Sequence, residues 1–257
     1  MQNHHSLVAL LIFATLPCAA QTLTLYDDFD HQYINPALWN TVCGTSELSQ
    51  ECVIEIQDEH LRLARRVTGD PGSNTGWQYG QATAFFFNPV PIKGITADMV
   101  VRRIDEQPCA ANPSFGSHGD IIARFFNAGN GTESGDVGAS VSIGRAASDP
   151  KGQLTVFAGY FQPGDYSHNL WLGTVSVGTP VTVSVKWDQP NHRFLYSWTN
   201  KTTNVTTSGV QPYPFSDTTP AADPEKHLDV EVFPSNCTAT QTWQYGETLF
   251  SKVHIWQ

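Results

Sequence analysis

Basic residues are scarce in this chain of 257 residues. Only 14 lysines and arginines stand against 24 aspartates and glutamates, which gives a formal net charge of −10 at pH 7. Contacts to nucleic-acid phosphates or to an anionic membrane surface need clustered cations. The sequence therefore predicts neither nucleic acid nor a charged membrane surface as a partner. Charged residues of both signs make up only 15% of the chain, so uncharged polar residues must cover much of the surface.

Long hydrophobic runs are absent apart from one, LVALLIFATL at residues 7–16. This run is too short to cross a bilayer as a helix. Pro17 and three small residues at 18–20 follow it, a pattern typical of a cleaved signal peptide, although no lysine or arginine precedes the run. We therefore expect residues 1–20 to be a signal peptide and residues 21–257 to be a single secreted domain without a membrane span. The alternative for the run is a buried N-terminal helix.

Long stretches with apolar residues at helical spacing are also missing. Instead, apolar and polar residues alternate with a period of two. Val181, Val183, Val185 and Trp187 are separated by single polar residues, as are the apolar residues of 228–232. Such strands turn one face to a core and the other to solvent or a groove. We expect strands at 22–29, 52–56, 60–66, 77–87, 92–104, 120–127, 137–145, 153–161, 170–173, 181–187, 193–198, 202–210, 227–233 and 249–256. So many short strands predict an all-β fold, a two-sheet antiparallel sandwich or jelly roll.

Cysteine occurs at five positions, and Cys18 would leave with the signal peptide. The other four are Cys43, Cys52, Cys109 and Cys237, which in an oxidising compartment implies two disulfides with three possible pairings. We favour Cys43 with Cys52 and Cys109 with Cys237, because neighbours in the sequence meet most easily. A zinc site is the less favoured alternative, because the chain contains no Cys-x-x-Cys pair.

Several segments resemble concanavalin A-like lectin/glucanase domains in their layout. These are Tyr26-Asp27-Asp28-Phe29 with the later 34–39, the hairpin 53–63, and the terminal strand 250–256. The resemblance covers roughly residues 22–257. It implies a jelly roll of two curved antiparallel sheets whose concave face often binds glycans. The retaining glucanases of that superfamily carry Glu-x-Asp-x-x-Glu on a concave strand, and no glutamate here has an aspartate two positions on. The resemblance therefore favours a carbohydrate-binding domain without catalysis.

Paired carboxylates offer the clearest catalytic candidates. Asp229 and Glu231 lie on the strand face opposite the apolar residues of 228–232, about 6 to 7 Å apart. Retaining glycosidases hold two carboxylates about 5 Å apart, so these two and Asp120 are candidates for a divergent glycoside hydrolase or polysaccharide lyase. Arg124 shares a strand face with Asp120, and such a pair could hold a sugar diol. The alternatives are solvated carboxylates on an outward face and a surface ion pair.

Aromatic side chains are the main candidates for sugar binding, because the apolar face of a pyranose stacks on a flat ring. Trp77 and Tyr79 lie two residues apart after a glycine-rich loop, and Tyr166 and Trp171 flank a polar loop. The alternative for these residues is burial in the sandwich. Core packing is expected for the remaining candidates, which are Trp39, Trp187, Trp198 and Trp256.

A Ca²⁺ site is a further candidate. Asp27, Asp28 and Asp30 form an acidic cluster near a strand end, and oxygen ligands suit Ca²⁺, but the spacing matches no EF-hand loop. Three classes of function therefore stay open: a secreted domain that binds a polysaccharide or glycan, a divergent enzyme acting on one, and an extracellular structural domain without a glycan ligand.

Overall fold

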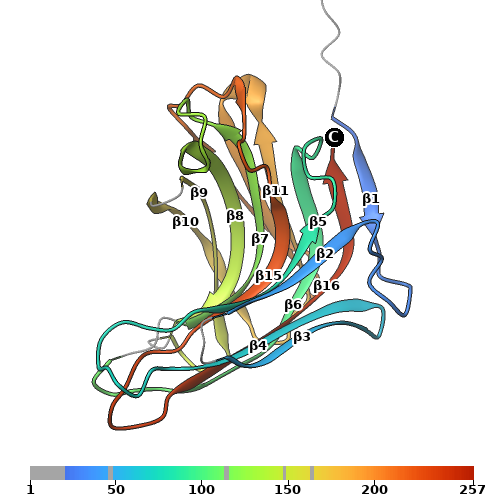
Figure 1. Ribbon diagram of the computed structural model, residues 1–257. Helices are drawn as coiled ribbons and strands as arrows, with labels where there is room; N and C mark the ends of the chain where they lie inside the picture. Colours follow the sequence, from blue (N-terminus) through green and yellow to red (C-terminus); the bar gives the residue numbers. More distant parts are fainter. Residues whose placement is uncertain (1–20, 46–48, 113–115, 147–148, 163–164) are drawn as a thin grey trace, which may run out of the picture.

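The computed structural model describes residues 21–45, 49–112, 116–146, 149–162 and 165–257. The expected signal peptide lies outside the described residues. The chain forms two antiparallel eight-stranded sheets that stack face to face (Figure 1). This architecture confirms the predicted two-sheet antiparallel sandwich. Within the described ranges, no helix is long and apolar enough to cross a bilayer.

Sheet A has the strand order β13-β12-β11-β6-β16-β4-β3, and β1 also pairs with β16. Its strands are β1 (Leu23–Asp27), β3 (Ser49–Gln57), β4 (His60–Thr68), β6 (Gly94–Gln107), β11 (Val181–Asp188), β12 (Arg193–Asn200), β13 (Val205–Pro212) and β16 (Trp243–Trp256). A short 3₁₀ helix, η2 (Gln189–Asn191), forms the predicted turn between β11 and β12.

Sheet B has the order β10-β9-β8-β7-β15-β5-β2, and β14 also pairs with β7. Its strands are β2 (Trp39–Thr45), β5 (Gly80–Phe86), β7 (Gly116–Asn127), β8 (Asp136–Arg145), β9 (Gln153–Gln162), β10 (Asp165–Ser176), β14 (Thr219–Pro220) and β15 (Lys226–Phe233). A second 3₁₀ helix, η1 (Glu133–Gly135), precedes β8.

Two strands were not expected from the sequence. β2 is an edge strand whose residues 40–43 are exposed, so it lacks the apolar alternation that marks a half-buried strand. It forms because β5 supplies a backbone ladder to pair with. β14 is only two residues long, too short for any periodicity.

The core lies between the sheets and is filled by the alternating residues of both. Val183 and Val185 of sheet A and Ile121 of sheet B are fully buried there, and each such side chain contributes about 1.5–3 kcal/mol through burial. The expected packing is confirmed for Trp39, Trp187 and Trp198, which are all buried. It is wrong for Trp256, whose indole is only half-buried and lies under the Lys186 ammonium.

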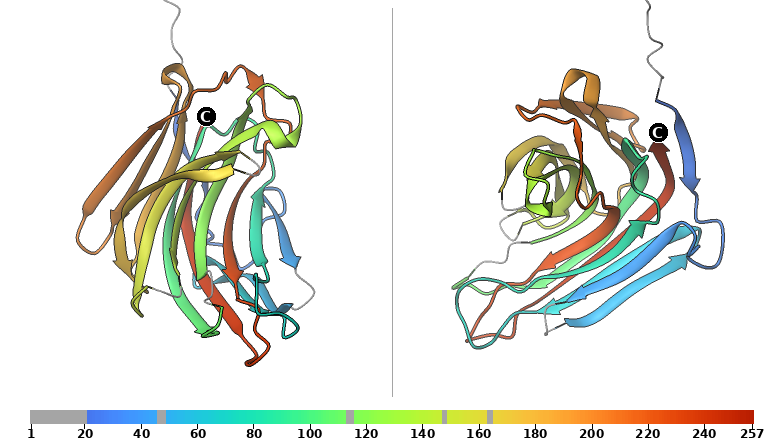
Figure 2. Two further views of the ribbon diagram at one scale, coloured as in Figure 1. Left: turned by 90° about the vertical axis from the view of Figure 1, so that its left-hand side faces the viewer. Right: turned by 45° about the horizontal axis from the view of Figure 1, so that its top comes forward.

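Sheet B is strongly curved, and its strands bow towards sheet A (Figure 1 and Figure 2). Its outer face, turned away from sheet A, is therefore concave, and we call it the hollow face. The strand register places one row of side chains across this face: Val42, Thr83, Asp229, Asp120, Ser142, Phe157 and Trp171. A neighbouring row contains Gly44, Gln81, Glu231, His118, Gly144 and Thr155.

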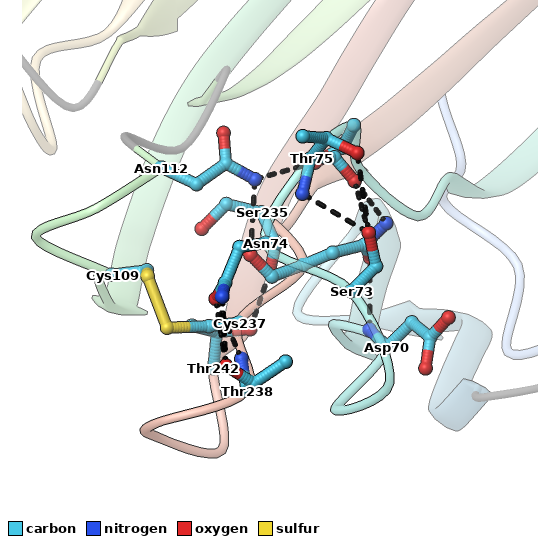
Figure 3. The surroundings of a disulfide bond; sticks show 12 residues. Asp70, Ser73, Asn74, Thr75, Cys109, Asn112, Ser235, Cys237, Thr238 and Thr242 are labelled. Carbon is cyan, nitrogen blue, oxygen red and sulfur yellow. Dashed lines mark hydrogen bonds between the residues drawn. A yellow bond between two sulfur atoms is a disulfide. The ribbon is translucent and has the colours of Figure 1, made fainter.

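The two disulfides confirm the predicted pairing, Cys43 with Cys52 and Cys109 with Cys237. The first joins β2 of sheet B to β3 of sheet A. The second joins loops near the end of the hollow face, where Asn112 Nδ2 also donates to the carbonyl oxygens of Gly76 (2.8 Å) and Asn236 (3.0 Å) (Figure 3). Together these bonds fix the loop that precedes β5.

Candidate functional site

Five polar side chains meet in the middle of the hollow face. His118 and Asp120 come from β7, Asp229 and Glu231 come from β15, and Tyr79 directly precedes β5. The antiparallel register sets Asp229 opposite Asp120 and Glu231 opposite His118. Because side chains alternate along a strand, the apolar neighbours of these residues point into the core and the polar residues point away from it. The structure thus brings together all three carboxylates that the sequence suggested as catalytic candidates.

A histidine links two of these carboxylates. His118 Nδ1 lies 2.5 Å from Asp120 Oδ2, and its Nε2 lies 3.7 Å from Glu231 Oε2. The Tyr79 hydroxyl donates a hydrogen bond to Glu231 Oε1 (2.6 Å) and also contacts the side-chain oxygen of Gln81. Glu231 therefore lies between a hydroxyl donor on one side and an imidazole on the other.

Asp229 is the most deeply placed of the carboxyl groups. It is completely buried, and neither of its oxygens accepts a hydrogen bond from an N–H or O–H group of the described residues. Burial raises the pKa of Asp229 well above its ordinary value, and the nearby charges of Glu231 and Asp120 raise it further. A carboxyl group in such a place takes up a proton rather than remain charged, and this proton can be shared with Asp120.

The other members of the cluster also have perturbed pKa values. Burial raises the pKa of Glu231, although the nearby His118 opposes this effect. Burial alone would lower the pKa of His118, but the charge and hydrogen bond of Asp120 outweigh burial and raise it to about 9. Burial raises the pKa of Tyr79 above its ordinary value, so its hydroxyl keeps its proton. At neutral pH, His118 is therefore a cation beside Glu231.

Only one of the three carboxyl groups is open to a ligand. The side chain of Glu231 is 16% exposed, whereas those of Asp120 and Asp229 are 1% and 0% exposed. His118 is 22% exposed, and Tyr79 and Gln81 are also only partly buried. A bound molecule would therefore contact Glu231, whereas Asp120 and Asp229 lie buried beneath it and would affect the ligand only through their neighbours.

Aromatic rings surround the cluster. Phe233 packs against both Tyr79 and His118, with ring centroids 5.2 and 5.4 Å apart, and Phe157 meets His118 edge-on at 6.0 Å. Trp171 is paired with Phe157 in the strand register and is 67% exposed. Trp77, in the loop held by the second disulfide, is 47% exposed. Burial in the sandwich was the alternative for the two tryptophans, and the structure places both at the surface.

Arg124 does not form the expected diol-binding pair with Asp120. Its guanidinium lies 2.6 Å from Asp223 and 3.1 Å from Glu225, further along the hollow face. Asp120 instead uses one carboxylate oxygen to hold His118. Strand alternation alone could not reveal that another chain segment supplies both partners of Arg124.

Two further sets of candidates do not belong to the cluster. One is Tyr166, and the other is the group of aspartates near the end of β1. The backbone of Tyr166 belongs to β10, but its side chain lies outside the described part of the structure. Asp27 accepts hydrogen bonds from Phe29 N (2.8 Å) and Trp39 Nε1 (2.7 Å), and Asp28 accepts one from Asp30 N (3.4 Å). These aspartates, the suggested Ca²⁺ ligands, thus support the turn after β1.

Sequence reasoning missed the residues that link the candidates to one another. His118 and Gln81 carry a signal, because each lies two positions from a chosen residue, Asp120 or Tyr79, and so shares its strand face. That these faces meet depends on the register between strands far apart in the sequence, which no local pattern specifies.

No family model matches this chain, and no curated protein matches it. Solved structures with a similar fold include an endo-β-galactosidase from Clostridium perfringens that releases GlcNAcα1-4Gal (9% identity, TM-score 0.48, covering 93% of this chain and 63% of that chain). Peanut lectin is 15% identical, with a TM-score of 0.44 over 93% of this chain and 99% of the lectin. Scytalido-glutamic peptidase is 12% identical, with a TM-score of 0.41 over 63% of this chain and 69% of the peptidase. The chain thus spans less than two thirds of the endo-β-galactosidase.

Proposed function

We propose that the hollow face of sheet B binds a glycan chain and that Glu231 hydrolyses a glycosidic bond there by general acid–base catalysis. The observation behind this proposal is that Glu231 is the accessible member of a buried carboxyl cluster flanked by aromatic rings. The chain would act outside the cell, because an expected signal peptide and two disulfides suit export to an oxidising compartment.

Glycan binding is supported by the mixture of side chains on this face. The exposed indoles of Trp77 and Trp171 offer flat surfaces for the apolar faces of sugar rings. Glu231, Gln81 and His118 between them offer donors and acceptors for hydroxyl groups. Sugar-binding sites need both kinds of contact.

Catalysis is supported by the unusual position of the acids. A domain that only binds sugar gains nothing from a carboxyl group like Asp229, which lies buried beside a second carboxylate and accepts no hydrogen bond from the described residues, although His227 Nε2 lies 3.5 Å away. Clusters of acids with shifted pKa values mark sites where a proton is moved. The sequence favoured a non-catalytic domain because no glutamate in the chain has an aspartate two positions on, as the glucanase motif requires, but these acids come from two neighbouring strands, which a linear motif cannot detect.

In the proposed reaction, Glu231 first donates a proton and later takes one back. The raised pKa favours the protonated form of Glu231, which donates its proton to the glycosidic oxygen as the C–O bond breaks. A water molecule then adds to the sugar carbon and returns a proton to Glu231. The Tyr79 hydroxyl and the His118 cation stabilise the charged carboxylate between these steps, and Asp120 holds His118 in place.

Asp120 itself is not proposed as a nucleophile. Its carboxylate oxygen lies within 4.8 Å of one from Glu231, close to the spacing of retaining glycosidases. However, it is buried and hydrogen-bonded to His118. The proposal therefore involves no covalent intermediate on this residue.

A polysaccharide lyase fits this site less well. Lyases act on uronate polymers, and the His118 cation, which could otherwise neutralise a substrate carboxylate, is already paired with Asp120. The raised pKa of Tyr79 also makes its hydroxyl a poor base. The site therefore suits a neutral glycan.

A non-catalytic carbohydrate-binding domain is the second candidate, favoured by the exposed Trp77 and Trp171 alone. The test compares the wild type with Glu231→Gln on β-glucan, xylan, galactan, galactomannan, alginate and denatured casein. It measures retention in affinity gels, release of reducing ends and release of peptides. Cleavage of a neutral glycan by the wild type, with retention but no cleavage by Glu231→Gln, supports the proposal.

The other outcomes separate the alternatives. Equal retention of both proteins without any cleavage overturns catalysis and leaves the binding domain. Ultraviolet absorbance from an unsaturated alginate product would assign a lyase, and release of peptides from casein would assign the same carboxyl group to peptide hydrolysis. Failure to retain or cleave any of the polymers would overturn both functions.

A further inference from the structure

A cavity of about 470 Å³ lies at the end of sheet B where β2 and β15 begin and β5 ends. Its lining includes Trp39, Asn40, Phe85, Phe87, Glu225 and Lys226. The cavity lies outside the carboxyl cluster described above, and none of the catalytic steps uses it.

The cavity walls combine an aromatic side with a polar side. Phe87 is 65% exposed, and Phe85 is partly exposed. On the polar side, Asp223 and Glu225 are held in place by the Arg124 guanidinium at 2.6 and 3.1 Å. An aromatic face opposite fixed carboxylates can stack on a pyranose ring and accept hydrogen bonds from its hydroxyl groups.

The floor of the cavity is fixed by a buried lysine. Lys226 is 2% exposed, and its Nζ donates hydrogen bonds to the carbonyl oxygens of Arg124 (2.8 Å) and Pro224 (3.2 Å). These bonds keep the segment that carries Asp223 and Glu225 against the start of β15. The polar wall is therefore held in position before any ligand arrives.

Direct contacts connect this cavity to the carboxyl cluster. The ring of Phe85 meets that of His227 at 5.0 Å, and His227 Nε2 lies 3.5 Å from Asp229 Oδ2. Along β5, Phe85 lies four positions from Gln81, which is paired with Glu231, a distance of about 13 Å in a strand. A group in the cavity and a bond at Glu231 are therefore too far apart to belong to one sugar ring.

We propose that this cavity is a remote subsite that holds one neutral sugar unit of the glycan chain whose cleaved bond lies at Glu231. This inference rests on the proposed function and deepens it. It makes the protein selective for chain length, because only an oligosaccharide long enough to reach from Glu231 to Phe87 gains the additional contacts. Asp223 and Glu225 exclude a uronate from this position by charge repulsion.

The experiment uses Phe87→Ala, with Val90→Ala as the matched control. Val90 is exposed to a similar extent, 64%, in the same loop and does not line the cavity. Calorimetry measures the affinity of each protein for oligosaccharides, from the disaccharide to the hexasaccharide, of the polymer that the wild type retains. We expect Phe87→Ala to weaken hexasaccharide binding about tenfold and to leave disaccharide binding unchanged, whereas Val90→Ala changes neither.

The outcomes distinguish this inference from the proposed function. If Phe87→Ala weakens all lengths equally, or weakens none, the subsite is overturned while glycan binding stands. If the wild type retains no polymer, both are overturned. Thermal unfolding of the two variants shows whether each has folded, and the exposure of both side chains predicts midpoints close to that of the wild type.

Discussion

The outer face of each sheet carries a glutamate that is largely shielded from solvent, and the pKa values of these two glutamates shift in opposite directions. On sheet A, Glu247 is only 6% exposed, but Arg62 Nε lies 3.1 Å and Arg102 Nη1 lies 3.5 Å from its Oε1, and the Tyr245 hydroxyl donates to its Oε2 at 2.7 Å. Burial alone would raise the pKa of Glu247, but these partners outweigh it and lower the pKa. On the hollow face of sheet B, the pKa of Glu231 is raised.

The difference lies in the partners. Arginines cover the outer face of sheet A, where Arg66 stacks on Trp243 and Arg103 stacks on Tyr245. On the hollow face, the ion pairs of Glu231 and Asp229 within the described part of the chain are with His118 and His227. A fully paired carboxylate stabilises the fold and has no spare proton to exchange, whereas a poorly paired one costs stability and can exchange a proton.

The largest effect is expected from removing the accessible acid. Glu231→Gln should lower kcat/KM for glycan hydrolysis by about 10²–10⁴-fold, the usual contribution of a general acid–base group. Glu247→Gln, the matched change on the other face, should leave kcat/KM unchanged. Reducing-end assays on a neutral polysaccharide give both values, and equal losses in the two variants would remove the distinction between the faces.

The free energy of unfolding should respond to Glu247→Gln, the substitution that leaves catalysis unchanged. Glu247→Gln removes one of the two carboxylate partners of Arg62, which keeps Glu55 at 2.8 Å, and should lower the free energy of unfolding by about 1.5–3 kcal/mol at neutral pH. Because the pKa of Glu247 is lowered below its ordinary 4.5, its contribution is present above that pH and is lost as the pH falls. Urea unfolding at neutral and at acid pH measures both effects. A cost that does not shrink in acid would argue against an ionised Glu247.

Asp229→Asn should raise stability at neutral pH, by about 1 kcal/mol or more, because the amide can donate to Asp120 without the proton uptake that the buried acid requires. The pKa of Asp229 is raised above its ordinary 3.8. This acid therefore favours folding below that pH and opposes folding increasingly as the pH rises through its folded pKa. The gain from Asp229→Asn should thus grow with pH, as urea unfolding across a pH series would show. A loss of stability at every pH would mean that Asp229 is better paired than we infer.

The smallest effect is expected at the edge of the hollow face. Trp171→Ala should weaken binding of a long oligosaccharide about tenfold, through the loss of one stacking surface. Trp243→Ala, which removes an indole from sheet A, should not change this affinity. Calorimetry with the same hexasaccharide makes the comparison, and an equal loss in both variants would place the glycan somewhere other than the hollow face.

Local alternation explains how much could be predicted from the sequence. The pattern in 181–187 correctly indicated a half-buried strand, and that in 228–232 correctly indicated a strand of a two-sheet sandwich with a shared face for Asp229 and Glu231, although this strand is buried on both faces. Sequence proximity also gave the correct disulfide pairing. Solvent exposure was the alternative for Asp229, and the structure buries it, because the curvature of sheet B depends on strands distant in the sequence.

Non-local packing explains what was not predicted. His118 joins the cluster only because β7 lies beside β15 in one particular register. Arg124 pairs with a segment about a hundred residues away, and Trp256 lies on an outer surface although its strand ends in the core pattern. Each of these depends on which strands become neighbours, and alternation within one strand carries no information about that.

The central claim is that the pKa of Glu231 on the hollow face is raised, whereas the pKa of Glu247 on the outer face of sheet A is lowered. Carbon NMR of selectively labelled glutamate carboxyl groups, assigned with Glu231→Gln and Glu247→Gln, measures both pKa values in one titration. The account predicts a pKa above 4.5 for Glu231 and below 4.5 for Glu247. The reverse order, or the same value for both groups, would contradict it.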